Sequence, residues 1–273
     1  LNADGTDTGD DIAITLNGDV FTLRNGDLAS GCNIPNNEEP EECSNFSYYY
    51  ADIPLVKNDP TTLYRVKFID GAADLIEVTS GLESRPHIAF NTDLNLVYAV
   101  YGNGNGFDTI DTATGSIVSS TAFDERLSSV TAVVYFRGDL YIGDDKKDKV
   151  YQYNLASGSM MEIATDVSVQ GGDLVVVNEQ LFLASKQGGG TWYLITGGGA
   201  TFAADIPKEV NGASTTNDGG ILFANKGSEA FNKLNGETIT SIPVFLDGEL
   251  FKLRHGDLAS GCNVPNNEEQ CSP

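Results

Sequence analysis

The four cysteines are the residues whose spacing most clearly indicates chemistry. They form two close pairs, Cys32 with Cys43 and Cys262 with Cys271. Each pair encloses a short polar segment rich in turn residues, which favours two local disulfides. Zinc is the alternative, but a zinc site needs thiolates or imidazoles at short spacing, and neither segment contains a C-x-x-C or a histidine. Disulfides persist in oxidising compartments, so we expect a secreted, extracellular or cell-surface protein.

An acidic segment, residues 1–13, opens the sequence. Ca²⁺ takes six to eight oxygen ligands from flexible loops, and the candidate ligands here are Asp4, Asp7, Asp10 and Asp11. The segment differs from the twelve-residue calcium loop between two helices, because it lacks the terminal Glu and any flanking helix. We therefore expect either a calcium loop or a flexible acidic linker, with no cofactor required and Ca²⁺ as an optional ligand.

The sequence contains none of the common catalytic motifs. Its only histidines, His87 and His255, stand in no nucleophile motif, and G-x-S-x-G, H-E-x-x-H and P-loop patterns are missing. Glycine-rich runs at 102–106, 188–190 and 197–199 precede no helix that could bind a phosphate, so we interpret them as turns. We expect no enzyme activity. A pair of carboxylates acting in glycoside hydrolysis stays open, since the sequence singles out no pair.

The charge of the chain excludes some partners. With 39 acidic and 16 basic residues, the formal net charge is −23, which disfavours nucleic acid and anionic membrane surfaces. No apolar run is long enough to cross a bilayer as a helix, so we expect no membrane insertion. The first residues lack the pattern of a signal peptide, and we expect any such peptide to have been removed. The mixed charges of Gly143–Lys149 predict a solvated turn.

Alternating runs such as Leu63–Ile69 predict a chain made almost entirely of strands and turns. A pattern of four strands recurs with a period of about 40 residues, most clearly from Arg85 to Asp124. Further copies follow at 130–164, 173–204 and 213–242, and residues 48–78 supply the later strands of another. A β-sandwich is the alternative, although it fits the even spacing less well.

The repeated four-strand pattern resembles a known type of protein. A Leu-Tyr strand, an Ile-Asp-x-x-Thr-Gly turn at Ile110–Gly115 and an apolar strand resemble the blades of secreted bacterial β-propellers, over Tyr48 to Ile242. The resemblance implies an all-β fold, a β-propeller of about five to seven four-stranded blades. Five blades can be counted, and a sixth stays open. Propellers carry many unrelated activities, so the fold implies no function by itself.

A longer repeat relates the two ends of the chain. Phe21–Glu39 and Phe251–Glu269 agree at 16 of 19 positions, without any insertion or deletion. Either a unit that reaches from one copy to the next repeats in tandem in a longer polypeptide, or both copies lie in one closed propeller as near-equivalent strands. We favour the tandem array, because the internal blades resemble one another only in pattern.

These repeats suggest a division of the chain. We expect the acidic segment at 1–13, the propeller at 14–242 with a disulfide loop at 32–43, and a duplicate of the 14–43 segment at 243–273 with a disulfide loop at 262–271.

The aromatic residues offer few contact sites. Trp192 has alternating apolar neighbours and is expected in the core. In the run Tyr48–Tyr50, Tyr48 and Tyr50 should point to one face of a strand and Tyr49 to the other, which leaves at least one ring as an exposed contact site.

Together these features favour an extracellular structural or adhesive protein, a propeller unit that assembles into a surface fibre or filament, or a tandem adhesin, and binds through its loops. The repeat organisation resembles very large secreted adhesins of marine or gliding bacteria. The expected partners are neighbouring copies or tandem units and surface glycans. The alternative is a self-contained glycan-binding propeller or a glycoside hydrolase acting at the central channel.

Overall fold

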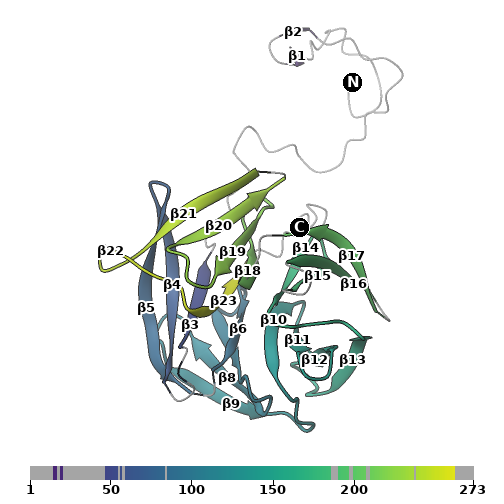
Figure 1. Ribbon diagram of the computed structural model, residues 1–273. Coiled ribbons are helices and arrows are strands. Elements are labelled where there is room, and N and C mark those ends of the chain that lie inside the picture. Colours follow the sequence, from purple (N-terminus) through teal and green to yellow (C-terminus); the bar gives the residue numbers. More distant parts are fainter. Residues whose placement is uncertain are drawn as a thin grey trace, which may run out of the picture. The chain divides into compact units, whose positions relative to one another are not determined.

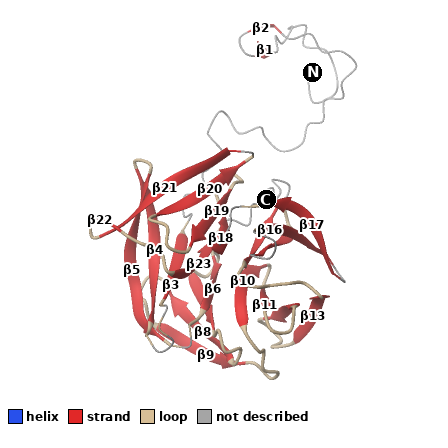
Figure 2. Cartoon of the chain, viewed as in Figure 1, coloured by secondary structure: helices blue, strands red, loops and turns tan. Residues whose placement is uncertain are grey.

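The computed structural model describes residues 15–16, 19–20, 47–54, 56, 59–83, 85–185, 190–196, 199–206, 210–236 and 238–261. The chain divides into two compact units, Leu1–Pro40 and Glu41–Pro273. The described residues form strands joined by turns and loops, as Figure 2 shows, and the predicted all-β fold is confirmed. No helix long and apolar enough to cross a membrane occurs among them.

Four blades of the second unit follow the chain from their inner to their outer strand (Figure 1). Blade 2 contains β6 (His87–Asn91), β7 (Leu96–Val100), β8 (Gly106–Asp111) and β9 (Ile117–Ala122). Blade 3 contains β10 (Val130–Phe136), β11 (Asp139–Asp144), β12 (Lys149–Asn154) and β13 (Met160–Thr165). Blade 4 contains β14 (Asp173–Val177), β15 (Gln180–Ser185), β16 (Thr191–Thr196) and β17 (Gly199–Asp205). Blade 5 contains β18 (Val210–Thr215), β19 (Ile221–Asn225), β20 (Ala230–Asn235) and β21 (Thr238–Leu246).

Blade 1 is assembled from both ends of the unit. Its outer strands are β3 (Tyr48–Ile53), β4 (Thr61–Ile69) and β5 (Ala72–Leu82), and its inner strand is β23 (His255–Ser260). The inner strands of the blades contact one another in the order β23, β6, β10, β14 and β18, and β18 contacts β23 again. The described residues therefore form a closed propeller of five blades.

The propeller extends further along the chain than the sequence predicted. We expected it to end at residue 242, with the duplicated segment outside it. The structure instead places β23, which belongs to the C-terminal copy of the long repeat, inside blade 1. The boundary was wrong because blade 1 has only three strands until this segment joins it.

The last strand of blade 5 also contacts blade 1. Residues Val244–Leu246 of β21 pair in parallel with Ala73–Leu75 of β5. The chain then turns back into β22 (Glu249–Leu250) through Asp247 and Gly248, whose φ angles are 53° and 83°. Two consecutive positive φ angles and an Asp-Gly pair are typical of the two-residue turn that matches the twist of a hairpin.

The N-terminal unit contains the same hairpin. Strand β1 (Thr15–Leu16) pairs with β2 (Asp19–Val20), with Thr15 opposite Val20 and Leu16 opposite Asp19. In the second unit, Phe245 lies opposite Leu250 and Leu246 opposite Glu249. The interval along the chain between the two hairpins equals the interval between the two copies of the long repeat. The repeat therefore includes the hairpin, with the same strand pairing in both places. Asn17-Gly18 takes the place of Asp247-Gly248 in the sequence.

Five hydrophobic clusters make up the core, one between each pair of neighbouring blades. The cluster between blades 5 and 1 contains Tyr50, Phe231 and Leu258, all of them almost completely buried. Burial of one such side chain stabilises the fold by about 2 kcal/mol. Because each blade packs face to face against two others, both faces of the inner strands are covered.

The prediction that at least one tyrosine of the run Tyr48–Tyr50 is exposed was wrong, because all three are buried by this packing. Tyr48, Tyr49 and Tyr50 are 6, 3 and 0 % exposed. Their alternation is as predicted, with Tyr48 and Tyr50 in the cluster toward blade 5 and Tyr49 in the cluster toward blade 2. They form no contact site because β3 lies between two neighbouring blades. Trp192 is 7 % exposed and stacks on Phe182, which confirms its place in the core.

Gly212 gives a test of the ring closure. A Cβ atom added there would lie 2.6 Å from the backbone nitrogen of Leu258, so β18 and β23 approach more closely than a side chain allows. We expect Gly212→Ala to destabilise the fold by about 1–3 kcal/mol through overpacking. Gly199→Ala is the matched control, because a Cβ there meets nothing within 4 Å. Denaturant unfolding of both variants would measure the difference, and equal stabilities would contradict the close contact.

Candidate functional site

Strand β23 is the element that closes the ring, and we call it the closing strand. Its six residues pair antiparallel with β3, from His255 opposite Ile53 to Ser260 opposite Tyr48. The closing strand lies between β3 and the inner strands β6 and β18. We call this position the slot. The Ser260 hydroxyl donates a hydrogen bond to the carbonyl of Thr215 in β18.

An ion pair fixes the start of the closing strand. The Arg254 guanidinium donates from Nε to Asp52 Oδ2 at 2.7 Å, and its terminal nitrogen contacts the same oxygen. The Asp52 side chain has no exposed surface, whereas that of Arg254 is 42 % exposed. The Tyr50 hydroxyl donates to Asp52 Oδ1 and accepts from the Arg254 backbone N–H. The hydrogen bond to Asp52 raises the pKa of Arg254, and burial raises the pKa of Tyr50.

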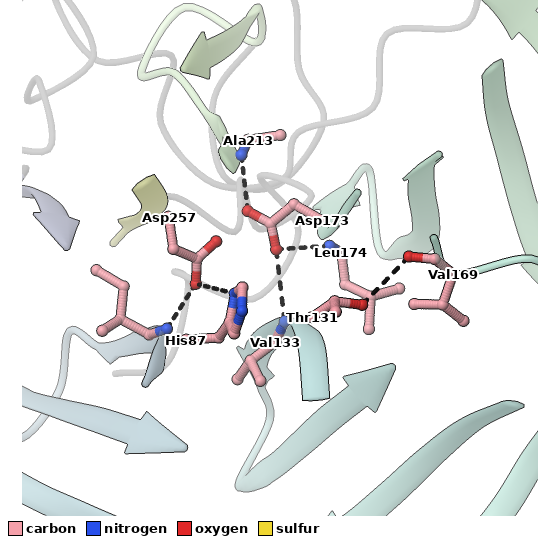
Figure 3. Close-up of polar contacts among 9 residues, drawn as sticks. His87, Thr131, Val133, Val169, Asp173, Leu174, Ala213 and Asp257 are labelled. Atoms are coloured by element: carbon pink, nitrogen blue, oxygen red, sulfur yellow. Dashed lines mark hydrogen bonds and ion pairs between the residues drawn. The ribbon is translucent and has the colours of Figure 1, made fainter. Parts of the chain in front are cut away.

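The closing strand also carries a carboxylate into the centre of the propeller. Asp257 is fully buried, and its Oδ2 accepts a hydrogen bond of 2.6 Å from the backbone N–H of Ile88. The same oxygen lies 3.5 Å from His87 Nδ1. Its other oxygen, Oδ1, has no hydrogen-bond donor among the described residues. In Figure 3 that oxygen points toward the carboxyl group of Asp173.

Asp173 occupies the corresponding position in blade 4. It lies opposite Ala184 in the second strand of its blade, as Asp257 lies opposite Ala51. Its oxygens accept hydrogen bonds from the backbone N–H groups of Val133 at 3.4 Å, Leu174 at 2.8 Å and Ala213 at 2.7 Å (Figure 3). We call Asp173 and Asp257 the axial carboxylates.

The axial carboxylates are coupled. Burial raises the pKa of Asp173 well above its ordinary value, and the charge of Asp257 and a hydrogen bond between the two carboxyl groups raise it further. Two neighbouring carboxylates in a desolvated site repel each other when both are ionised, so this site favours the protonated form of Asp173.

The two axial carboxylates together contact every blade. Asp257 extends from blade 1 to Ile88 in blade 2, and Asp173 extends from blade 4 to Val133 in blade 3 and Ala213 in blade 5. The inner strand of a blade has one edge without a strand partner in its own sheet. Backbone N–H groups buried at such an edge need an acceptor, and the carboxylates provide it.

The chemistry open to this centre is limited by its size. The cavity between the five inner strands has a volume of about 10 Å³, which is about the space one water molecule requires. Among the residues that the structure describes, no group of three or more His, Cys, Asp or Glu side chains is arranged to hold a metal ion. The centre can hold a proton and connect strands, but a sugar ring does not fit in it.

A larger groove lies between blades 3 and 4. Its volume is about 310 Å³, and it is lined mainly by the apolar and aromatic side chains of Phe136, Tyr141, Ile163, Leu181, Leu194 and Ile195. Glu179 is the only carboxylate among the described residues that line it, and it forms an ion pair with Arg137.

Most of the site residues expected from the sequence lie outside the described residues. This applies to the proposed calcium ligands Asp4, Asp7, Asp10 and Asp11 and to the cysteines Cys32, Cys43, Cys262 and Cys271. The predicted disulfides and the calcium loop therefore stay predictions.

The charged segment Gly143–Lys149 is not simply a solvated turn. Asp144 has no exposed surface and accepts hydrogen bonds from the backbone N–H groups of Ser128, Ser129 and Lys146. It is the last residue of the second strand of blade 3, and Asp52 is the next-to-last residue of the second strand of blade 1. In both blades this aspartate anchors the chain that leads into an inner strand.

The axial carboxylates were missed by sequence reasoning. The sequence held only a partial signal, since Gly-Asp-Leu occurs at 172–174 and at 256–258 but also at 26–28 and 138–140. At 172–174 and 256–258 it begins within or just before an inner strand, whereas Asp139 begins the second strand of blade 3. Superposing the blade repeats would have placed Asp173 and Asp257 at one position of the blade, although not face to face.

Comparisons with known proteins support the fold. No known family matches the sequence, and no curated protein matches it. A chain from the crystal structure of a nidogen/laminin complex is similar over 80 % of this chain and 98 % of that chain, with 9 % identity and a TM-score of 0.53. A virginiamycin B lyase from Staphylococcus aureus is similar over 75 % of this chain and 76 % of its own, with 13 % identity and a TM-score of 0.45. The similarity to the chain from the nidogen/laminin complex supports the β-propeller fold.

The raised pKa of Asp173 makes its contribution to stability depend on pH. This pKa is higher in the folded protein than in the unfolded chain, so Asp173 retains its proton over a wider pH range in the folded protein. The stabilisation from Asp173 is therefore fully present below about pH 4 and falls as the pH rises toward the folded-state pKa, by about 1.4 kcal/mol per pH unit for one proton. We expect Asp173→Asn to remove this fall, because an amide does not ionise.

Denaturant unfolding between pH 4 and 8 would measure this effect. Thr131→Val is the control. It removes an uncharged hydroxyl on an inner strand, which donates a hydrogen bond to the Val169 carbonyl. It should therefore change stability equally at each pH. An unchanged slope for Asp173→Asn would contradict the raised pKa of Asp173.

The slot itself can be tested at Asp52. We expect Asp52→Ala to lower the free energy of unfolding by about 2 kcal/mol, because it removes a charge-assisted hydrogen bond and the acceptor of the Tyr50 hydroxyl. Glu162→Ala is the comparison, since the half-exposed pair Lys149–Glu162 should contribute less than about 1 kcal/mol. Chemical denaturation would compare the two variants, and a smaller loss for Asp52→Ala would refute the anchoring role.

Proposed function

We propose that this chain is an extracellular structural or adhesive protein, in which the propeller is a unit that joins further units in a surface fibre or tandem adhesin. One observation carries the proposal: the chain contains the sequence of its closing strand twice. The C-terminal copy closes blade 1, and the N-terminal copy, Phe21–Glu39, repeats it at 16 of 19 positions.

The repeated hairpin supports the same conclusion. A closed propeller of this kind has one slot and needs one closing strand. A polypeptide built from tandem units would contain the segment from β21 through β23 once per unit, with the hairpin and the closing strand together. The hairpin β1–β2 occurs in the register of β21–β22 and stands directly before the N-terminal copy. The N-terminal unit then corresponds to the end of a preceding propeller.

The rim of the propeller offers surface for contacts. The outer strand of every blade exposes a large hydrophobic side chain, namely Ile76, Ile117, Val118, Met161, Phe202 and Ile239. Outer strands also present backbone groups without strand partners, except where β21 pairs with β5. Apolar side chains along such edges favour contacts with neighbouring molecules.

Glycan binding is the second candidate function, and the groove between blades 3 and 4 supports it. Its volume of about 310 Å³ lies at the lower end of the range for ligand sites. The aromatic side chains of Phe136 and Tyr141 could stack against sugar rings. The central cavity is too small for this role. A hydrolase needs two carboxyl groups beside the scissile bond, and Glu179 alone lines the groove, so binding is better supported than hydrolysis. A glycan array would separate this candidate from the first.

The proposed function predicts a polypeptide larger than a single unit. We expect an antibody raised against residues 41–261 to detect, in the source organism, a product larger than 29.1 kDa under reducing and denaturing conditions. Protease treatment of intact cells should remove it and leave a cytoplasmic marker intact. A native product of only this single-unit mass, without a larger precursor or polymer, would rule out the assembly role.

A further inference from the structure

We propose that the N-terminal copy of the repeat, residues 21–31, is a second closing strand that competes with β23 for the slot of its own propeller. The inference goes beyond the proposed function. It depends on the repeat and on the contacts of β23, and holds wherever in the cell or outside it the protein works.

Five residues that bind in the slot recur in the N-terminal copy. Arg254, which precedes β23, binds Asp52, and Asp257 binds Ile88. Leu258 and Ala259 pack in the core clusters, and Ser260 binds Thr215. Their counterparts in the sequence are Arg24, Asp27, Leu28, Ala29 and Ser30.

Within residues 21–31 the two copies differ at two positions, where Thr22 stands in place of Lys252 and Asn25 in place of His255. Lys252 is exposed and His255 is only partly buried. The slot therefore receives almost the same set of buried groups from either copy.

The order of strands favours the N-terminal copy as much as it favours β23. Blades 2 to 5 each run along the chain from inner to outer strand. If the N-terminal copy filled the slot, blade 1 would have this same order, because residues 25–30 precede β3. In the register of β23, Ser30 would lie opposite Tyr48, and the segment from Gly31 to Ser47 is long enough to connect them.

The connection determines which molecule supplies the strand. A short flexible linker gives an effective concentration in the millimolar range. A strand from a second molecule at about micromolar concentration competes poorly with that. We therefore assign the competing strand to the same chain, and its entry releases the C-terminal copy from the slot.

Hydrogen exchange followed by mass spectrometry on the full chain would test the proposal. The peptides covering 21–31 and 251–261 differ in mass, so protection of each copy can be followed separately. We expect Leu258→Asp, which places a charge in a fully buried position, to move protection from the second peptide to the first. Exchange in 21–31 should then be at least about tenfold slower than in the double variant Leu28→Asp/Leu258→Asp.

Thermal unfolding adds an independent measurement. Leu258→Asp and the matched variant Leu28→Asp should each melt within about 5 °C of the parent, because one intact closing strand remains. The double variant should melt at least about 10 °C lower. The milder pair Leu258→Ala and Leu28→Ala, with their double variant, should show the same order if the aspartates prevent folding.

Two results would overturn the inference. Leu258→Asp could be as unstable as the double variant, with no protection gained in 21–31, which would show that the N-terminal copy does not enter the slot. Alternatively, protection of 21–31 in Leu258→Asp could occur only in samples that light scattering shows to be dimeric. That result would place the competing strand in a second molecule. Neither result bears on the mass of the native polypeptide, so the proposed function is tested separately.

Discussion

The hydrogen bonds of two buried carboxylates, Asp173 and Asp257, link the inner strands of all five blades, and the closed ring depends on them. The constraint arises from backbone chemistry. Each inner strand presents N–H groups at an edge that no strand of its own blade covers, and the narrow centre has room for about one water molecule to satisfy them. A carboxylate can accept several such bonds at once, and it does so most strongly where the surroundings are dry. The same desolvation raises the pKa of Asp173 and so favours its protonated form.

This requirement makes the closing strand more than the fourth strand of one blade. It supplies one of the two axial carboxylates through Asp257, a buried core side chain through Leu258 and the partner of the buried Asp52 through Arg254. An empty slot would leave Asp52 as a buried charge without its cation, a costly state. The slot therefore strongly favours being filled, and it selects a strand with this specific set of residues.

The blade pattern could be predicted from sequence because it depends on local alternation. The predicted copies at 130–164 and 173–204 agree with blades 3 and 4, which extend from Val130 to Thr165 and from Asp173 to Asp205. What the sequence could not provide is the contact between segments distant along the chain. The burial of Tyr48–Tyr50 depends on blades 2 and 5 covering both faces of β3.

The same limit applies to charge. Asp144 belongs to a segment whose composition is typical of a solvated turn, yet it is buried because the loop before β10 folds over it. The pairing of Asp173 with Asp257 depends on ring closure, which brings blades 1 and 4 together at the centre. Sequence patterns locate strands, but they do not show which acceptor will meet an unpaired N–H group from another blade.

The duplication also has a thermodynamic consequence for assembly. Exchanging one closing strand for a near-identical one preserves almost every contact in the slot, so the contacts contribute little net free energy to the choice between them. The choice is then determined by connectivity, because the tether sets the effective concentration of each strand. In a single chain this favours exchange within the molecule. In the proposed polypeptide of tandem units, a strand released from one slot would be followed in the chain by the next unit, and exchange between units would be a form of domain swapping.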